Sequence, residues 1–249
     1  MLGLGNDLVN RYNTNIGNAS ICLSPLFNPF YMGYSQSKGL AYKFDTKVEY
    51  NFNQKRSISL NVSLGYNFKI RQFYYTIPLQ FTYNKHRDGY IKITYGNGNR
   101  ISNASVYEDV KQNNDTIDYT KIDLNRFNDT HIEVLNHIDL FKWLGLSTGY
   151  VFHTRHAVDE RSFELAKRPY IYRSFAPSVQ FELHPWKIGP LFTFNYERGI
   201  KGISKSDVGY EKFEFDGVYK FKLMRLRTLS FRAGGGFYTD KGSDIFVDY

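Results

Sequence analysis

The chain has 249 residues, of which 18% are aromatic, and a formal net charge of +8. The aromatic content excludes a disordered chain, because disordered segments are poor in aromatic residues. The single cysteine, Cys22, excludes an internal disulfide framework and any multi-cysteine metal site. The positive charge is compatible with anionic partners such as nucleic acid, phospholipid or lipopolysaccharide phosphates, and it selects none of them.

Neither a transmembrane helix nor a signal peptide is predicted. No stretch approaches about 18 consecutive apolar residues, although the alternating strands of a transmembrane barrel would escape this criterion. Residues Met1–Asp7 lack the basic and apolar regions of a secretory signal. The protein is therefore expected to be either cytosolic or a piece of a longer precursor.

Three segments alternate between apolar and polar residues with a period of two: Leu40–Phe52, Ile58–Ile70 and Phe73–Tyr83. Alternation over such lengths predicts strands rather than helices. Weaker copies raise the total to about ten strands, near Tyr90–Tyr95, His131–Leu140, Leu144–Thr154, Ser174–Leu183, Pro190–Glu197, Tyr210–Phe221 and Thr228–Gly235. Ala19–Leu23 is expected to be a strand remnant, and Ala104–Gln112 a local helix within a loop.

The connections between these strands alternate in length. Long ones are Gly96–Thr130, Arg155–Arg173 and Arg198–Gly209, and short ones separate them, with a tight turn at Arg71 and Gln72 as the exception. Short turns on one side and long loops on the other are typical of an outer-membrane barrel. We expect an all-β fold: an antiparallel up-and-down transmembrane β-barrel, incomplete, with an irregular segment over residues 1–39 and barrel strands over residues 40–249.

Aromatic residues cluster at the ends of the apolar faces. In Leu40–Phe52, Tyr42 and Phe44 stand at one end of the apolar face, and Tyr50 and Phe52 at the other. Aromatic ends around an aliphatic middle are typical of the two interfacial girdles of a membrane barrel. The opposite face carries rows of both charges: Lys43, Asp45, Lys47, Glu49, and later Lys212, Glu214, Asp216 and Lys220. These rows fit a water-filled lumen, or alternatively the solvated exterior of a soluble barrel.

Several motifs carry a family resemblance. They are Tyr95–Arg100, Tyr172–Pro177, Tyr196–Gly202, Tyr210–Asp216, Leu226–Asp240 and Phe246–Tyr249. Together they resemble a Bacteroidetes outer-membrane β-barrel family of unknown function, whose members usually carry an N-terminal carboxypeptidase-regulatory-like domain. The resemblance extends from about Leu40 onward and implies an outer-membrane location without implying any chemistry. Because that domain, a signal peptide and later strands are missing, the resemblance implies an internal fragment of the barrel.

Residue types that could support catalysis occur without a motif. His131, His137, Ser147, His153 and Asp159 could serve a hydrolase at the barrel rim, and His153, His156, Asp159 and Glu160 could bind a metal. Positions three apart on a strand point to opposite faces, so His153 and His156 converge only if the chain bends. The sequence therefore assigns no catalytic, cofactor-binding or metal-binding residue and predicts no cofactor.

Glycine-rich and basic segments also occur between and within the predicted strands. Gly234–Gly236 ends an alternating strand, which favours a kink or bulge over a phosphate loop. Arg198 and Gly199 bear a distant likeness to the Arg-Gly loop of barrels that fold other barrels, but a tight turn is the simpler interpretation. Basic loop residues could pair with lipopolysaccharide phosphates: Arg155, Arg161, Lys167, Arg168, Arg173, Arg198, Lys201 and Lys205. Nucleic-acid binding is disfavoured because the aromatics occupy the opposite face.

The expected function is that of an integral outer-membrane β-barrel protein, in solute passage or envelope assembly, without enzymatic activity. Its expected partners are outer-membrane lipid and lipopolysaccharide. A soluble, ligand-binding antiparallel barrel with an apolar interior and a rim hydrolase are the two alternatives.

Overall fold

The computed structural model describes residues 12–25, 32–35, 39–69, 71–102, 126–186, 189–224 and 227–241. Within these residues, thirteen strands form one antiparallel sheet whose order follows the chain, with β3 paired to β4 beside this path. Its two ends are β1 and β13, so the described strands form an open meander. The chain divides into an N-terminal unit, Met1–Asn99 with Thr130–Glu133, and a C-terminal unit, Arg100–Asp129 with Val134–Tyr249.

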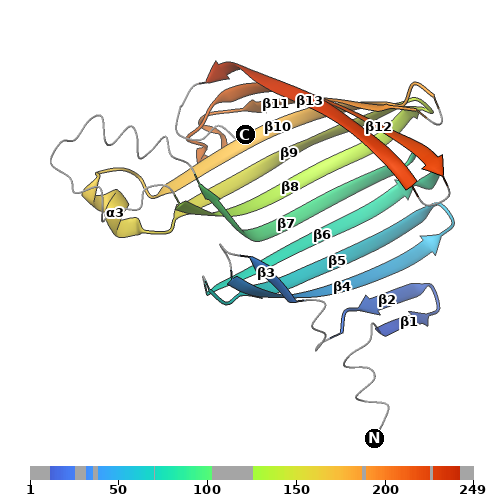
Figure 1. The fold of residues 1–249 in the computed structure, drawn as a ribbon, viewed down its shortest axis with the longest axis horizontal. Helices are drawn as coiled ribbons and strands as arrows, with labels where there is room; N and C mark the ends of the chain where they lie inside the picture. Colours follow the sequence, from blue (N-terminus) through green and yellow to red (C-terminus); the bar gives the residue numbers. More distant parts are fainter. Residues whose placement is uncertain are drawn as a thin grey trace, which may run out of the picture. The chain divides into compact units, whose positions relative to one another are not determined.

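The strands of the N-terminal unit include β4, β5 and β6, which lie side by side in Figure 1. Their bounds are β1 Tyr12–Ile16, β2 Ala19–Leu23, β3 Met32–Ser35, β4 Gly39–Asn53, β5 Arg56–Asn67, β6 Gln72–Asn84 and β7 Gly89–Ser102. Tight turns join the long strands: Arg71 and Asp88 adopt left-handed φ values of 49° and 44° at two of them. At a third, the Asn53 side chain accepts from the backbone N–H of Arg56 at 2.8 Å.

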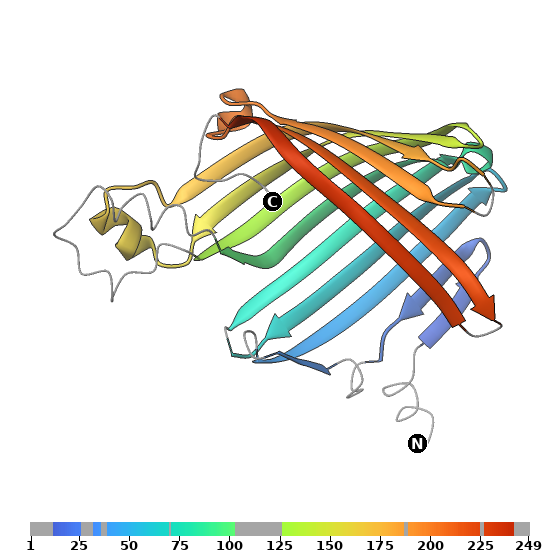
Figure 2. The same ribbon diagram turned by 45° about the horizontal axis from the view of Figure 1, so that its top comes forward.

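The remaining strands also pair in chain order, and β10, β11, β12 and β13 lie next to one another in Figure 2. Their bounds are β8 Arg126–Phe141, β9 Leu144–Ala157, β10 Ile171–Leu183, β11 Leu191–Gly199, β12 Tyr210–Met224 and β13 Arg227–Lys241. β7 and β8 contribute to both units. No helix in the described part of the chain is long and apolar enough to cross a bilayer.

The predicted all-β, antiparallel, up-and-down order is confirmed, and so are the predicted strands and the strand at Ala19–Leu23, which is β2. Two short strands, β1 and β3, have no counterpart among the predicted strands. The local helix expected at Ala104–Gln112 and the motif Phe246–Tyr249 lie outside the described residues.

The connection between β9 and β10 is shorter than expected and contains a helix, α3 Glu160–Leu165. The Asp159 carboxylate caps it, accepting from the Ser162 hydroxyl at 2.6 Å. Phe163 packs edge-on against Phe127 of β8, with ring centroids 5.4 Å apart. These residues belong to the apolar core of the C-terminal unit, with Ala157, Ala166, Tyr172, Ala176, Val208 and Tyr210. A helix this short escapes sequence analysis because it shows fewer than two turns of helical period.

The bulge expected at Gly234–Gly236 lies elsewhere. β13 continues through the glycines to Lys241, and Asp216 and Glu214 face Gly234 and Gly236 in unbroken register. The register shifts instead between Glu211 and Lys212 of the neighbouring strand.

Apart from the apolar core of the C-terminal unit, several strands expose apolar side chains on one face and bury small polar ones on the other. In β7, Ile91, Ile93 and Tyr95 are 39–42% exposed, whereas Thr94 between them is 7% exposed. The C-terminal unit repeats this: Tyr150 and Phe181 are exposed, whereas Ser147 and Ser174 are buried. This is the reverse of a water-soluble sheet, in which the apolar face packs into the core.

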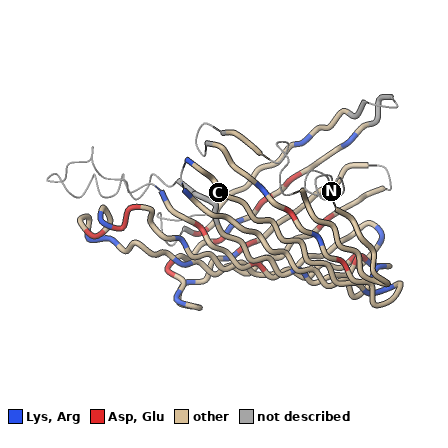
Figure 3. The backbone as a smooth tube through the Cα atoms, turned by 90° about the horizontal axis from the view of Figure 1, so that it is seen from below, with Lys and Arg blue, Asp and Glu red and all other residues tan. Residues whose placement is uncertain are grey.

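Charged residues of both signs lie along the strands as isolated positions between longer uncharged stretches (Figure 3). In the N-terminal unit, Lys43 pairs with Asp45 at 3.1 Å and Lys47 with Glu49 at 3.2 Å, so each pair lies along one strand. In the C-terminal unit, Lys212 lies 3.2 Å from Glu214 on its own strand and 3.9 Å from Glu197 on β11. Opposite charges within each predicted row therefore lie next to one another and compensate each other.

Candidate functional site

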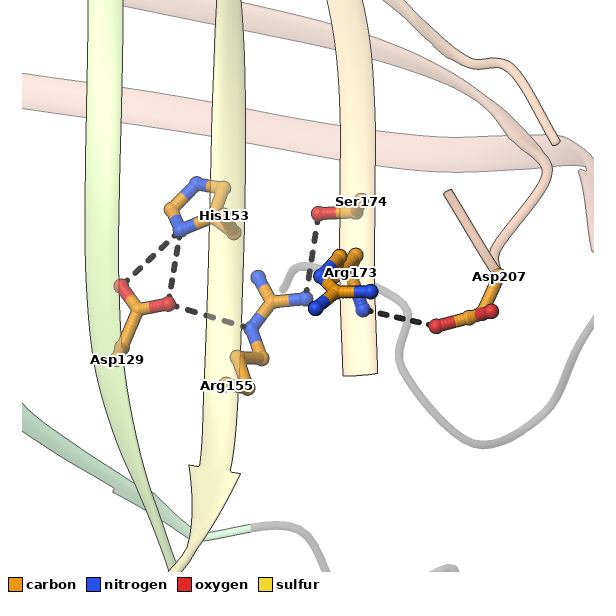
Figure 4. Close-up of polar contacts among 6 residues, drawn as sticks. All are labelled: Asp129, His153, Arg155, Arg173, Ser174 and Asp207. Carbon is orange, nitrogen blue, oxygen red and sulfur yellow. Dashed lines mark hydrogen bonds and ion pairs between the residues drawn. The ribbon is translucent and has the colours of Figure 1, made fainter. Parts of the chain in front are cut away.

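A cluster of buried polar side chains lies on β8, β9 and β10 of the C-terminal unit (Figure 4). His153 and Arg155 lie two residues apart on β9 and therefore on one face of it. The neighbouring strand places Ser174 directly opposite His153. Asp129 approaches both β9 side chains from β8.

The geometry of the cluster centres on the Asp129 carboxylate. His153 Nδ1 lies 3.0 Å from both of its oxygens. Arg155 Nε lies 3.5 Å from Oδ1. The same guanidinium donates from Nη1 to Ser174 Oγ at 3.4 Å. One carboxylate therefore orients an imidazole and a guanidinium, and the guanidinium reaches across to the next strand.

These groups are withdrawn from solvent. Arg155 is 2% exposed, Asp129 4% and Ser174 1%. A buried charge without compensation would be strongly destabilising, so the pairing of Asp129 with Arg155 is a structural requirement. Arg155 does not accept the proton of Ser174, so it does not activate this hydroxyl as a nucleophile. The arrangement links three strands through charge and hydrogen bonds, and it holds His153 in a defined orientation.

The cluster lies beside a loop that folds back onto β10. Asp207, which follows the short helical turn η3 Ile203–Lys205, accepts from the backbone N–H of Arg173 at 3.0 Å (Figure 4). Ser206 is buried and accepts from the backbone N–H of Phe175 at 3.3 Å. The loop between β11 and β12 is therefore anchored at the start of β10.

A second polar group brings together two residues considered for catalysis, His137 and Ser147. His137 Nδ1 lies 2.8 Å from Ser147 Oγ, and its Nε2 lies 3.5 Å from Asp139 Oδ1. A serine beside a histidine is the pair that nucleophilic catalysis requires. However, Ser147 is 3% exposed, which closes this hydroxyl to a substrate, and 3.5 Å is too long for a well-formed histidine–aspartate hydrogen bond.

His156, Asp159 and Glu160 take positions away from this cluster. His156 is exposed and pairs with Ile171 of β10. Because it lies three residues after His153 on the same strand, its side chain points to the opposite face. Asp159 caps α3, and Glu160 is an exposed residue of its first turn. His131 lies on β8, where its ring contacts the backbone at Gly96: a Cβ added to that glycine would meet His131 Cε1 at 2.6 Å.

Three basic residues predicted in long loops lie on strands instead: Arg155, Arg173 and Arg198. Arg155 was expected among the exposed basic residues of a long loop, but β9 extends to Ala157 and buries the side chain. Its partner Asp129 was missed entirely, because it lay in a segment expected to be loop. The predicted strand Leu144–Thr154 ends one residue before Arg155. Extending it to Ala157 places Arg155 on the same face as His153, because the two residues are two positions apart.

The chain matches one known protein family over nearly its whole length. It matches the family of unknown function (DUF5686) C-terminal domain over residues 2–185 and 179–249. No curated protein and no solved structure matches it significantly. Because the family match covers nearly the whole sequence, the chain belongs to the DUF5686 C-terminal domain family, whose function is unknown.

Proposed function

We propose that this domain is the membrane-embedded part of an outer-membrane β-barrel protein that serves the passage of polar solutes. Envelope assembly is the alternative role of the same barrel. The observation that carries the proposal is the inverted exposure of the strands, with apolar residues outside and polar ones buried. Hydrocarbon favours such an outer face. The described sheet is an open meander, so the proposal also requires its edges to be paired within the membrane, because lipid cannot satisfy open backbone groups.

Strand length and aromatic placement support the proposal. Strands β4 to β10 have 12–16 residues, and about 9–11 tilted residues suffice to cross a bilayer. Exposed aromatic pairs stand at strand ends: Tyr50 with Phe52, Tyr66 with Phe68, and Phe141 with Trp143. Aromatic residues favour the lipid–water interface because their rings are amphipathic.

The polar face fits contact with water. Asn61 Oδ1 and Thr94 Oγ1 are buried without a hydrogen-bond partner among the described residues. Buried polar atoms normally have a protein or ordered-water partner, which a polar interior provides more readily than an apolar one. The soluble alternative instead requires an enclosed apolar interior, yet Leu60, Val62, Ile77 and Leu79 remain partly exposed.

We further propose that the long-loop end faces lipopolysaccharide. Arg161 and Lys167 are exposed beside α3, and Lys201 and Lys205 are exposed around η3. Cationic side chains on this rim would pair with lipid phosphates. The apolar core of Phe127, Phe163, Tyr172 and Val208 supports these loops as a compact cap.

The test compares adjacent positions on opposite faces of β7. After Cys22→Ser, an environment-sensitive fluorophore is attached through Ile93→Cys or Lys92→Cys, and the full chain is refolded into phosphatidylcholine vesicles. Nitroxides on the lipid chains are expected to quench the fluorophore at position 93, because that side chain faces hydrocarbon. The matched position 92 is expected to respond to a water-soluble quencher instead. Equal aqueous quenching at both positions would overturn the proposal.

A further inference from the structure

The polar face of the C-terminal unit contains a pocket of about 640 Å³ over β10 to β13. Its lining includes Gln180 of β10, Asn195 of β11, Glu214 and Asp216 of β12, and Arg232 with Gly234–Gly236 of β13. The register explains the assembly: Gln180 faces Asn195, which in turn faces Glu214, and Glu214 faces Gly236. Side chains from four neighbouring strands therefore converge on one face.

The glycine run keeps part of the pocket free of side chains. A Cβ at Gly234 would lie 2.8 Å from Asp216 Oδ1, and one at Gly236 would lie 2.9 Å from the Phe213 carbonyl oxygen. Because both distances are below normal contact, the register tolerates only glycine there without rearrangement. The consequence is a section of bare backbone beside two carboxylates, a surface that a ligand can approach closely.

Each carboxylate of the pocket already has a cation beside it, although Lys212 also lies 3.9 Å from Glu197. Arg232 Nε lies 3.0 Å from both Asp216 oxygens, and Lys212 Nζ lies 3.2 Å from Glu214 Oε1. Asn195 donates to the second oxygen of Glu214 at 2.9 Å. The side chains of Glu214 and Asp216 nevertheless remain 43% and 31% exposed, so their free lone pairs face the pocket. A charged ligand gains little where each carboxylate already has a cation beside it, whereas a ligand that both donates and accepts hydrogen bonds can engage every group.

We infer that this pocket binds a neutral polyhydroxylated solute of saccharide type. Each hydroxyl of such a solute can donate to Glu214 or Asp216 and accept from Arg232, Asn195 or Gln180. A volume of about 640 Å³ lies within the range of small-molecule sites, about 300–1,000 Å³. The inference rests on the proposed function, because it identifies the class of solute that would meet the lumen-facing side of the sheet.

The experiment measures binding of neutral disaccharides of glucose, galactose and mannose to the full chain in detergent, by saturation-transfer NMR and calorimetry. At least one sugar is expected to bind, and Asp216→Asn and Asn195→Ala are each expected to weaken it at least tenfold. The matched control is Glu49→Gln, which removes a carboxylate paired with Lys47 and outside the pocket. It is expected to leave affinity unchanged.

The outcomes separate this inference from the proposed function. If the fluorophore at position 93 reports lipid but no disaccharide binds, the saccharide site is overturned and the membrane proposal stands. Binding of a zwitterionic dipeptide such as glycylglycine in place of every sugar would also overturn it. Binding that Asp216→Asn and Glu49→Gln weaken equally would place the sugar elsewhere and overturn the site. Sugar binding by a chain that fails to enter vesicles would overturn the proposed function alone.

Discussion

At the scale of single residues, the informative positions are the buried charges. Arg155 and Asp129 lie on different strands, yet each is more than nine-tenths buried and they compensate each other. Removing one partner of such a pair leaves an uncompensated charge, which is worse than removing both. The pair therefore links the strands that carry it while contributing a fixed orientation to His153.

The first residue-scale prediction follows from this pairing. Arg155→Met is expected to destabilise the folded protein by about 3–5 kcal/mol, because the buried Asp129 carboxylate then loses the guanidinium beside it. Urea titration of the vesicle-embedded chain measures this. Arg161→Met, at an exposed position on α3, is the control and is expected to stay within about 0.5 kcal/mol. Adding Asp129→Asn to Arg155→Met should restore part of the loss, and simple additivity of the two losses would contradict the coupling.

At the scale of elements, close approach of neighbouring strands limits which side chains they can carry. Gly149 of β9 lies against β8: an added Cβ would be 2.3 Å from the Val134 carbonyl oxygen and 3.1 Å from Leu135 Cα. These are backbone atoms and cannot move aside without displacing a strand. Gly235 of β13 offers the opposite case, since an added Cβ would have no neighbour within 4 Å.

These two glycines provide a matched pair of alanine substitutions. Gly149→Ala is expected to separate β8 from β9 locally and to destabilise the chain by about 1–3 kcal/mol, the range for overpacking. Gly235→Ala is expected to be neutral or to stabilise by up to about 1 kcal/mol, because it restricts the unfolded chain without a clash. Urea midpoints at constant slope report both. A loss at position 235 as large as that at position 149 would show that strand contact is not the cause.

At the scale of the whole molecule, the balance of exposed and buried side chains decides which solvent the chain requires. The described residues expose large apolar side chains on strands of both units, among them Ile93, Tyr150, Phe181 and Phe194. Extensive exposed apolar surface on a protein in water drives association. The fold is therefore expected to be compatible with lipid or detergent and incompatible with plain buffer.

The corresponding prediction concerns solubility. Refolded without detergent, the chain is expected to aggregate, and in a maltoside or phosphocholine micelle it is expected to elute as a single species. Size-exclusion chromatography with light scattering distinguishes these results. A monodisperse monomer in plain buffer, with cooperative unfolding, would favour the soluble barrel.

Much of the architecture could be predicted from the sequence, because alternation with period two is visible in each strand by itself, whichever strands it pairs with. Leu40–Phe52 and Phe73–Tyr83 were predicted almost to their observed ends. The candidate site could not be read in this way. Asp129 and Arg155 are far apart in the chain, and only strand pairing brings them within an ion-pair distance. The pocket could not be predicted either, because its lining comes from four strands. Its glycines also looked like the end of the last predicted strand, Thr228–Gly235.

The sequence by itself determined the fold class, the chain order of the strands and the division of each strand into an apolar and a polar face, because side chains alternate along extended backbone. Only the tertiary structure decided which face is exposed, where the buried ion pairs lie and that Arg155 is internal. Burial depends on the registers and packing of several strands at once, and no single segment contains that information.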